Sequence, residues 1–167
     1  MLDQIMDLVK QHAGDAIVNN NAIPNQHNDA AIQEVSSQIF SGLQNQISQG
    51  NLSQVTSLFQ GGSIANNPMV TQIISSVAGS LASKFGVSQQ SAQSIASSLI
   101  PTVMNKFINK TNDPTDSSFN LQDVLGGLGG GNLDIGGMLG KLGGSSNSKQ
   151  DEGGLGDIGG MLGGLFK

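Results

Sequence analysis

The sequence predicts an all-α protein: a small multi-helical bundle of about five helices, followed by a Gly/Leu-rich, partly disordered tail with short amphipathic helices. Apolar residues recur three and four positions apart over residues 1–110, which is the spacing of one helix face. Short segments rich in Gly, Asn and Pro separate these stretches and are typical of turns. Of the 24 glycines, 17 lie within residues 126–167. We therefore expect a helical core domain at 1–110, a polar linker at 111–122 and a Gly/Leu-rich repeat tail at 123–167.

The first two expected helices are separated by a turn rich in asparagine. An apolar face over residues 2–17 predicts the first helix, and the polar stretch 19–28, which contains Pro24, ends it. A second apolar face over residues 32–47 predicts the next helix, with acidic residues flanking its start, where they suit the helix dipole. This helix is expected to stop near Gly50, because glycine readily adopts the left-handed cap conformation. The acidic residues are Asp29 and Glu34.

The third expected helix is short, and the fourth has the clearest start. Asn51 is placed to cap the third helix, residues 52–59 carry its apolar face, and the glycines at 61–62 end it. The fourth helix starts where Asn67 can cap the first turn beside Pro68, whose missing N–H costs nothing in the first helical position.

The fifth expected helix contains a proline. Gly86 ends the fourth helix, Ser88 is placed to cap the fifth, and the apolar face then continues to Ile108. Because Pro101 removes a backbone hydrogen bond inside this stretch, a kink or a break is expected near Ile100.

The composition excludes several classes of function. There is no cysteine, which excludes disulfides, thiolate chemistry and Cys-ligated metal centres. The net charge is −5 with seven lysines and no arginine, so we expect no nucleic-acid partner. His12 and His27 are the only imidazoles, and neither has a catalytic partner at a suitable spacing, His12 being an ordinary, partly exposed histidine. We therefore expect a protein that is not an enzyme, with no catalytic residues, no metal and no cofactor.

Targeting and membrane signals are weak in this sequence. The N-terminus carries acidic residues where a secretory signal has positive charge, and no apolar run reaches the length of a membrane-spanning helix. We expect a cytoplasmic protein. A membrane partner is not expected, although the apolar tail keeps that alternative open.

Residues 81–100 have the outline of a helix-turn-helix motif. Ala82 stands where the helices would cross, Gly86 lies in the turn and Ser88 caps the second helix. The second helix offers glutamine and serine side chains, with Lys84 as the nearby cation, so phosphate contacts are few. A plain helical hairpin is the favoured interpretation, and a DNA-binding domain is kept as the alternative function.

The same stretch carries a resemblance to a known family. Its core resembles that of the YidB-like bacterial family of unknown function at Gly86, Ser88, Ala92, Leu99, Pro101, Val103 and the Lys106-Phe107 pair. The similarity extends over about 30–110 and takes in the amphipathic start of the chain and a Gly/Leu-rich segment, which family members place differently. The resemblance implies a multi-helical, homeodomain-like bacterial domain with no established activity and no catalytic residues.

Oxygen-bearing side chains in and just after the polar linker suggest calcium binding. They are Asn112, Asp113, Asp116, Ser118, Asn120 and Asp123. Their spacing is not that of an EF-hand loop, since no glycine is central and no glutamate ends it. Asx turns and a helix cap are the favoured interpretation.

The tail repeats one amphipathic pattern. Residues 134–142 recur as residues 157–165, and residues 123–128 form a weaker third copy. The apolar residues of the two clear copies are Ile135, Met138, Leu139, Leu142, Ile158, Met161, Leu162 and Leu165. Each intervening glycine costs a helix about 1 kcal/mol relative to alanine, so isolated copies should be mostly unfolded. They are predicted to bind a protein partner or another copy of the chain, the alternative being a solvated low-complexity tail.

Together these features predict a non-enzymatic protein-interaction or scaffold module of unknown process, with a self-associating tail. The glycine pairs Gly136/Gly140 and Gly159/Gly163 have the spacing that lets two helix backbones approach closely. This supports self-association as the first prediction, with DNA binding through residues 81–100 as the alternative.

Overall fold

The fold comes from a computed structural model, which describes residues 1–115 and 121–129. These residues form α-helices and two short helical turns, with no strand among them, which confirms the predicted all-α fold. The helices are α1 (Leu2–His12), α2 (Asn28–Ser48), α3 (Leu52–Phe59), α4 (Pro68–Phe85), α5 (Gln89–Thr111) and α6 (Leu121–Leu128). The turns are a π-helical turn at Gly14–Val18 and a 3-10 turn at Asn25–His27.

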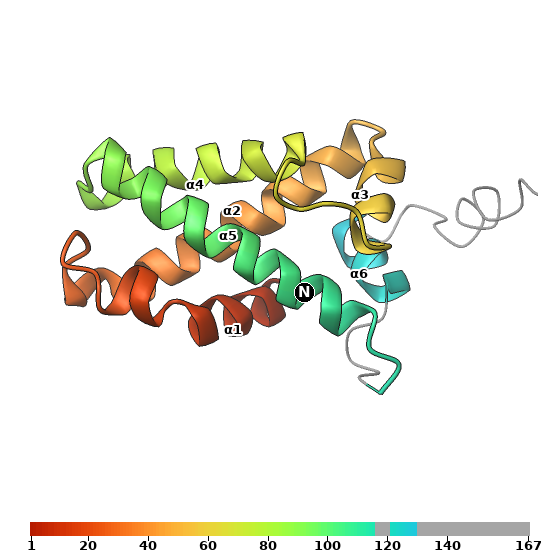
Figure 1. Ribbon diagram of the computed structural model, residues 1–167, viewed down its shortest axis with the longest axis horizontal. Coiled ribbons are helices and arrows are strands. Elements are labelled where there is room, and N and C mark those ends of the chain that lie inside the picture. The colour runs from red at the N-terminus through yellow and green to blue at the C-terminus, as the bar shows by residue number, and fades with distance from the viewer. Residues whose placement is uncertain (116–120, 130–167) are drawn as a thin grey trace, which may run out of the picture. The chain divides into compact units, whose positions relative to one another are not determined.

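Four helices make the body of the bundle. Both α1 and α4 pack against α2 and against α5. In Figure 1, α5 crosses the front between α4 and α1, and α2 runs behind it. The shorter α3 packs on α2 and α5, and α6 packs on α2. Each long helix therefore turns one apolar face toward its neighbours, as the sequence periodicity predicts.

Over residues 1–115 and 121–129 the interior is mainly aliphatic, with one buried aromatic pair. Phe59 of α3 and Phe107 of α5 meet edge to face, with ring centroids 5.4 Å apart and an interplanar angle of 77°. Beside this pair, the Asn112 side chain donates a 2.6 Å hydrogen bond to the backbone carbonyl of Phe59. These contacts join the end of α5 to α3.

The first helix is shorter than predicted. It ends at His12, and Gly14–Val18 form a π-helical turn in place of a continuous helix to Ile17. The amide of Val18 donates to the carbonyl of Ala13 at 3.0 Å, an i→i+5 bond. The turn still buries Ile17 completely, so the apolar pattern holds although the backbone geometry differs.

Most of the predicted helix ends are confirmed. Asn67 accepts a 2.9 Å hydrogen bond from the amide of Met69, and Ser88 accepts one from the amide of Ser91. Gly86 has a φ of +67°, the left-handed conformation that suits a residue without a side chain.

The predicted side-chain cap by Asn51 is wrong. Asn51 is the N-cap residue of α3, but its side chain makes no cap hydrogen bond. Its amide instead donates to Gln46 Oε1 at 2.9 Å, and the amide of Gln46 donates to Gln72 Oε1 at 3.0 Å. The Asn51 side chain thus supplies a hydrogen-bond donor to Gln46, a mostly buried residue of α2.

Pro101 does not break the fifth helix. The helix is continuous from Gln89 to Thr111 and contains Pro101 in its interior, so of the predicted kink or break the break is wrong, and the kink stays a prediction. The flanking residues Ile100 and Val103 are fully buried. Burial of the apolar face on both sides of the proline therefore outweighs the missing backbone bond.

A glycine allows α2 and α4 to approach closely. A Cβ atom added at Gly42 would lie 2.5 Å from Cγ1 of Ile73. Ile73 is buried, so its side chain fills the space that any other residue at position 42 would need. The periodicity of the sequence gives no sign of this contact.

The contacts divide the chain into two compact units, residues 1–133 and residues 134–167. All the described residues belong to the first unit. The helix α6 lies in that unit, because its apolar side chains pack on the helical core.

Candidate protein-interaction site

The helix α6 shows how one copy of the tail pattern binds an apolar surface. Val124, Leu125 and Leu128 are 1%, 0% and 1% exposed, and the helix packs on α2. Gln122, on the same helix, is exposed. This amphipathic helix at 121–128 includes the weaker third copy that the sequence predicts.

One glycine of α6 lies against the chain's first residue. A Cβ atom added at Gly127 would lie 2.5 Å from Cγ of Met1. At Gly126 the same atom would have nothing within 4 Å. We call the part of α2 and Met1 that α6 covers the α6 docking surface. The helix α6 packs tightly against this surface at Gly127, whereas Gly126 has open space around it.

The apolar positions of α6 align with those of the two clear repeats. Leu121, Val124, Leu125 and Leu128 are followed in the same spacing by Ile135, Met138, Leu139 and Leu142, and by Ile158, Met161, Leu162 and Leu165. These last eight residues are the predicted partner-binding residues, and all lie outside the described part of the chain. What the structure adds is the burial of three of the four equivalent positions in α6, Val124, Leu125 and Leu128, whereas Leu121 is half-buried.

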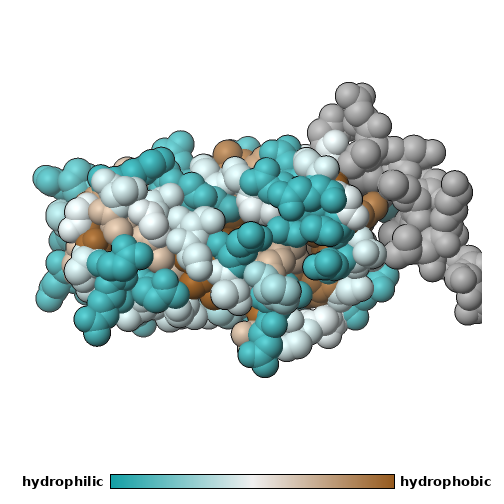
Figure 2. Space-filling view, turned by 90° about the horizontal axis from the view of Figure 1, so that it is seen from above, coloured by the Kyte–Doolittle hydropathy of each residue, from teal (hydrophilic) through white to brown (hydrophobic). Residues whose placement is uncertain are grey.

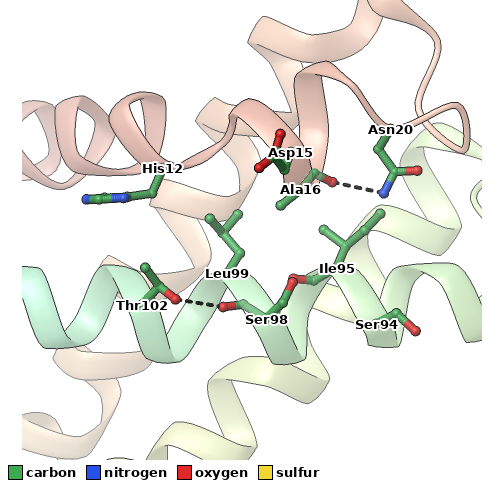
Figure 3. Close-up of a pocket in the computed structure, with 9 residues that line it drawn as sticks. All are labelled: His12, Asp15, Ala16, Asn20, Ser94, Ile95, Ser98, Leu99 and Thr102. Atoms are coloured by element: carbon green, nitrogen blue, oxygen red, sulfur yellow. Dashed lines mark hydrogen bonds between the residues drawn. The ribbon is translucent and has the colours of Figure 1, made fainter.

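A shallow depression of about 320 Å³ lies between α5 and the segment that follows α1. His12, Asp15 and Asn20 lie on one side of it, and Ser94 and Thr102 on the other (Figure 3). The imidazole of His12 and the carboxylate of Asp15 point in different directions (Figure 3), and Asp15 Oδ1 accepts a 3.3 Å hydrogen bond from the side-chain amide of Asn19. His12 is partly exposed, as predicted.

The α4–α5 segment is a helical hairpin with a three-residue connection at 86–88. Ala82 is half-buried, and Gln89, Gln90 and Ser94 are exposed on α5. The cation that the DNA-binding alternative depends on, Lys84, donates a 2.6 Å hydrogen bond to Glu34 Oε2 of α2.

The Glu34 side chain has a different role from the one predicted. It lies in the second turn of α2, where it pairs with Lys84, whereas Asp29 lies in the first turn as expected. Burial alone would raise the pKa of the Glu34 carboxyl. Hydrogen bonds from Lys84, Gln38 and Ser80, together with the charge of Lys84, outweigh burial and hold the pKa below its usual value.

The linker forms an Asx turn at Asp113, which confirms the favoured interpretation at that residue. Asp113 Oδ1 accepts hydrogen bonds from the amide and the hydroxyl of Thr115, at 2.8 and 2.6 Å. These bonds hold the pKa of Asp113 below its usual value. Asp116, Ser118 and Asn120 lie outside the described residues. Over residues 1–115 and 121–129, no group of three or more acidic or histidine side chains is placed to hold a metal ion.

The described surface is mainly polar. On the α4 side, hydrophobic colour lies in recesses between hydrophilic side chains (Figure 2). Leu2 and Val18, 36% and 42% exposed, are the large apolar side chains that are exposed in the described part of the chain. None of the helices described is long and apolar enough to cross a membrane.

The fold and the site together define a helical bundle that carries an apolar helix-docking surface. Within that class, the chain belongs to a family of bacterial proteins of unknown function (DUF937, the YidB-like family), whose model matches residues 67–166. The match begins at Asn67, the cap of α4, and continues through α5, α6 and the tail. No curated protein and no solved structure matches the chain.

Proposed function

We propose that this protein is a non-enzymatic interaction or scaffold module that self-associates, or binds a protein partner, through its tail repeats. The observation that carries this proposal is the burial of Val124, Leu125 and Leu128 of α6. These residues stand in the pattern that recurs at 135–142 and 158–165. A sequence of this kind therefore folds as a helix when an apolar surface covers it.

Glycine content supports a role in which the repeats fold on binding. Helix interiors with several glycines are unstable alone, because each glycine costs about 1 kcal/mol relative to alanine. Helices this short are marginal in water even without glycine. Burial of four apolar side chains per repeat against a partner supplies the missing stability. The partner surface is accordingly apolar, with another copy of the chain as the first candidate.

The test combines one substitution in each repeat, Leu139→Asp with Leu162→Asp. A matched control, Ser145→Asp with Ser148→Asp, adds the same charge between the repeats. Sedimentation over a range of concentrations and crosslinking with mass spectrometry in native cells measure association. We expect the leucine variant to lose self-association or partner crosslinks and the control to keep them. Equal mass and equal crosslinks in all three proteins would contradict the proposal.

The DNA-binding alternative for residues 81–100 stays a hypothesis with less support. Lys84 is engaged by Glu34, and the exposed face of α5 near its start carries amides and hydroxyls. Amides can read adenine, but phosphate contacts supply most of the affinity for DNA. Gln93 is another exposed glutamine of α5. A mobility-shift assay at low salt tests the alternative, and retardation that Gln93→Glu abolishes would favour it.

A further inference from the structure

We propose that the α6 docking surface of one molecule binds residues 158–165 of a second molecule, in exchange for its own α6. This inference rests on the proposed self-association and names its surface and its ligand. The helix α6 then has two roles: it completes the core of its own chain, and it blocks the surface against the tail of another.

The apolar side chains of the two segments are equivalent. The fully buried Leu125 and Leu128 correspond to Leu162 and Leu165, and Val124 corresponds to Met161. Methionine is longer than valine, but its unbranched, flexible side chain lets it adapt its shape to an irregular apolar site. Residues 158–165 thus present to the surface the same stripe that α6 presents.

The contact at Gly127 distinguishes between the two clear repeats. Any side chain at this position meets Met1, because even a Cβ atom would lie 2.5 Å from its Cγ. The equivalent residue is Gly164 in the last repeat and Lys141 in the middle repeat. The last repeat therefore fits the α6 docking surface without displacing Met1, and the middle repeat does not.

The docked α6 is suited to exchange. It has eight residues, of which Gly126 and Gly127 are glycines, so little of its stability comes from the helix itself. Within one chain, α6 follows α5 closely, whereas 158–165 lies much further along, so α6 has the higher effective concentration at its own surface. The last repeat therefore reaches a docking surface only when α6 has left it, and in this proposal that surface belongs to a second molecule.

The experiment removes α6 from the α6 docking surface in the full-length protein. Leu125→Asp removes the buried anchor of α6 without changing the surface, and Gln122→Asp places the same charge on the exposed face of the same helix. If α6 leaves its surface one tenth of the time, vacating it fully strengthens association about tenfold. We expect sedimentation to show this shift for Leu125→Asp alone, and Leu162→Asp in the same chain to reverse it.

Two adjacent glycines of the last repeat test which residue of that repeat lies against Met1 of the second molecule. In the Leu125→Asp background, Gly164→Ala places a Cβ atom against Met1 of the second molecule, whereas Gly163→Ala places one where Gly126 has open space. We expect Gly164→Ala to weaken association and Gly163→Ala to preserve it or strengthen it. Equal effects of the two substitutions would overturn the inference.

The folded state is checked by circular dichroism and by hydrogen exchange of α1–α5. If Leu125→Asp perturbs these helices, the milder Gly127→Ala replaces it, with Gly126→Ala as its control. Association that depends on Leu162 but is the same in Leu125→Asp and wild type would overturn the docking surface and leave the proposed function standing. Absence of any Leu139- or Leu162-dependent association or partner binding would overturn both.

Discussion

At the scale of single residues, Gly42 is required by the approach of α2 to α4. A Cβ atom there would lie 2.5 Å from Cγ1 of Ile73, which is buried and has little room to move. We expect Gly42→Ala to lower the free energy of unfolding by about 1–3 kcal/mol, as overpacking does. The matched control is Gly79→Ala in α4, which meets nothing within 4 Å and should stabilise the protein by up to about 1 kcal/mol. Urea denaturation measures both, and a stabilising Gly42→Ala would contradict this packing.

The Glu34–Lys84 pair predicts a small dependence of stability on pH. The pKa of folded Glu34 lies below its ordinary value of 4.5, so its contribution to stability is present above that pH. It is lost as the pH falls through the lower, folded pKa. Because Lys84 is 56% exposed and Glu34 is 14% exposed, we expect less than about 1 kcal/mol at neutral pH.

The pH dependence is measured against Glu34→Gln, which cannot titrate. Wild type should be the more stable protein near neutral pH, and the difference should shrink as the pH falls below 4.5. High salt should also reduce it, because part of the pair is exposed to solvent. A difference that is constant across this range would show that Glu34 contributes through packing alone.

At the scale of elements, the sequence predicts helices well and backbone detail poorly. The apolar spacing places Ile17 in the core whether the backbone forms an α-helix or the observed π-helical turn, so periodicity cannot separate the two. Likewise, Asn51 has the chemistry of a cap, but its use depends on Gln46 and Gln72, which only the packing of α2 on α4 brings near. Local signals fix helix positions, and tertiary contacts decide how polar side chains are used.

The candidate site is likewise predicted in part by local sequence signals and in part determined by tertiary contacts. The repeat pattern is visible in the sequence, since apolar residues and glycines alternate at fixed spacing. The sequence does not show which face of the repeat packs on a surface. That face is known only from the buried positions of α6 and from the contact between Gly127 and Met1, which lie at opposite ends of the described chain. The sequence alone aligns Val124 with Met161 and Gly127 with Gly164, and the structure shows which of the α6 positions are buried and which one meets Met1.

The docking of α6 gives a prediction for a pair of adjacent glycines. Gly126→Ala adds a methyl group in open space and favours the helix by about 1 kcal/mol, so it should strengthen docking. Gly127→Ala has the same helical preference but must displace the Met1 side chain, a cost that exceeds the gain, so it should weaken docking. Hydrogen exchange of the α6 amides measures docking directly. Equal protection in the two variants would show that Met1 does not restrict position 127.

At the scale of the whole molecule, family membership and packing divide the chain differently. The family match starts at the cap of α4 and runs to residue 166, so it spans both compact units. Yet α4 and α5 bury their apolar faces on α1 and α2, which precede the matched region. The matched segment therefore depends on the first three helices for a complete core, and α6 connects that core to the repeats.

The final prediction concerns how much of the chain the folded core needs. A chain ended after Leu133 retains α1–α6 and the whole first unit, so its free energy of unfolding should stay within about 0.5 kcal/mol of the full-length value. A chain ended after Thr115 also loses α6 and exposes the surface that Val124, Leu125 and Leu128 cover. Each fully buried aliphatic side chain contributes about 1.5–3 kcal/mol before the entropy of ordering the helix is subtracted, so a net loss of at least about 1 kcal/mol is expected.

Urea unfolding monitored by circular dichroism separates the outcomes. Equal stability of both shortened chains would mean that α6 rests on the core without stabilising it, and a large loss on ending the chain after Leu133 would mean that the second unit supports the first.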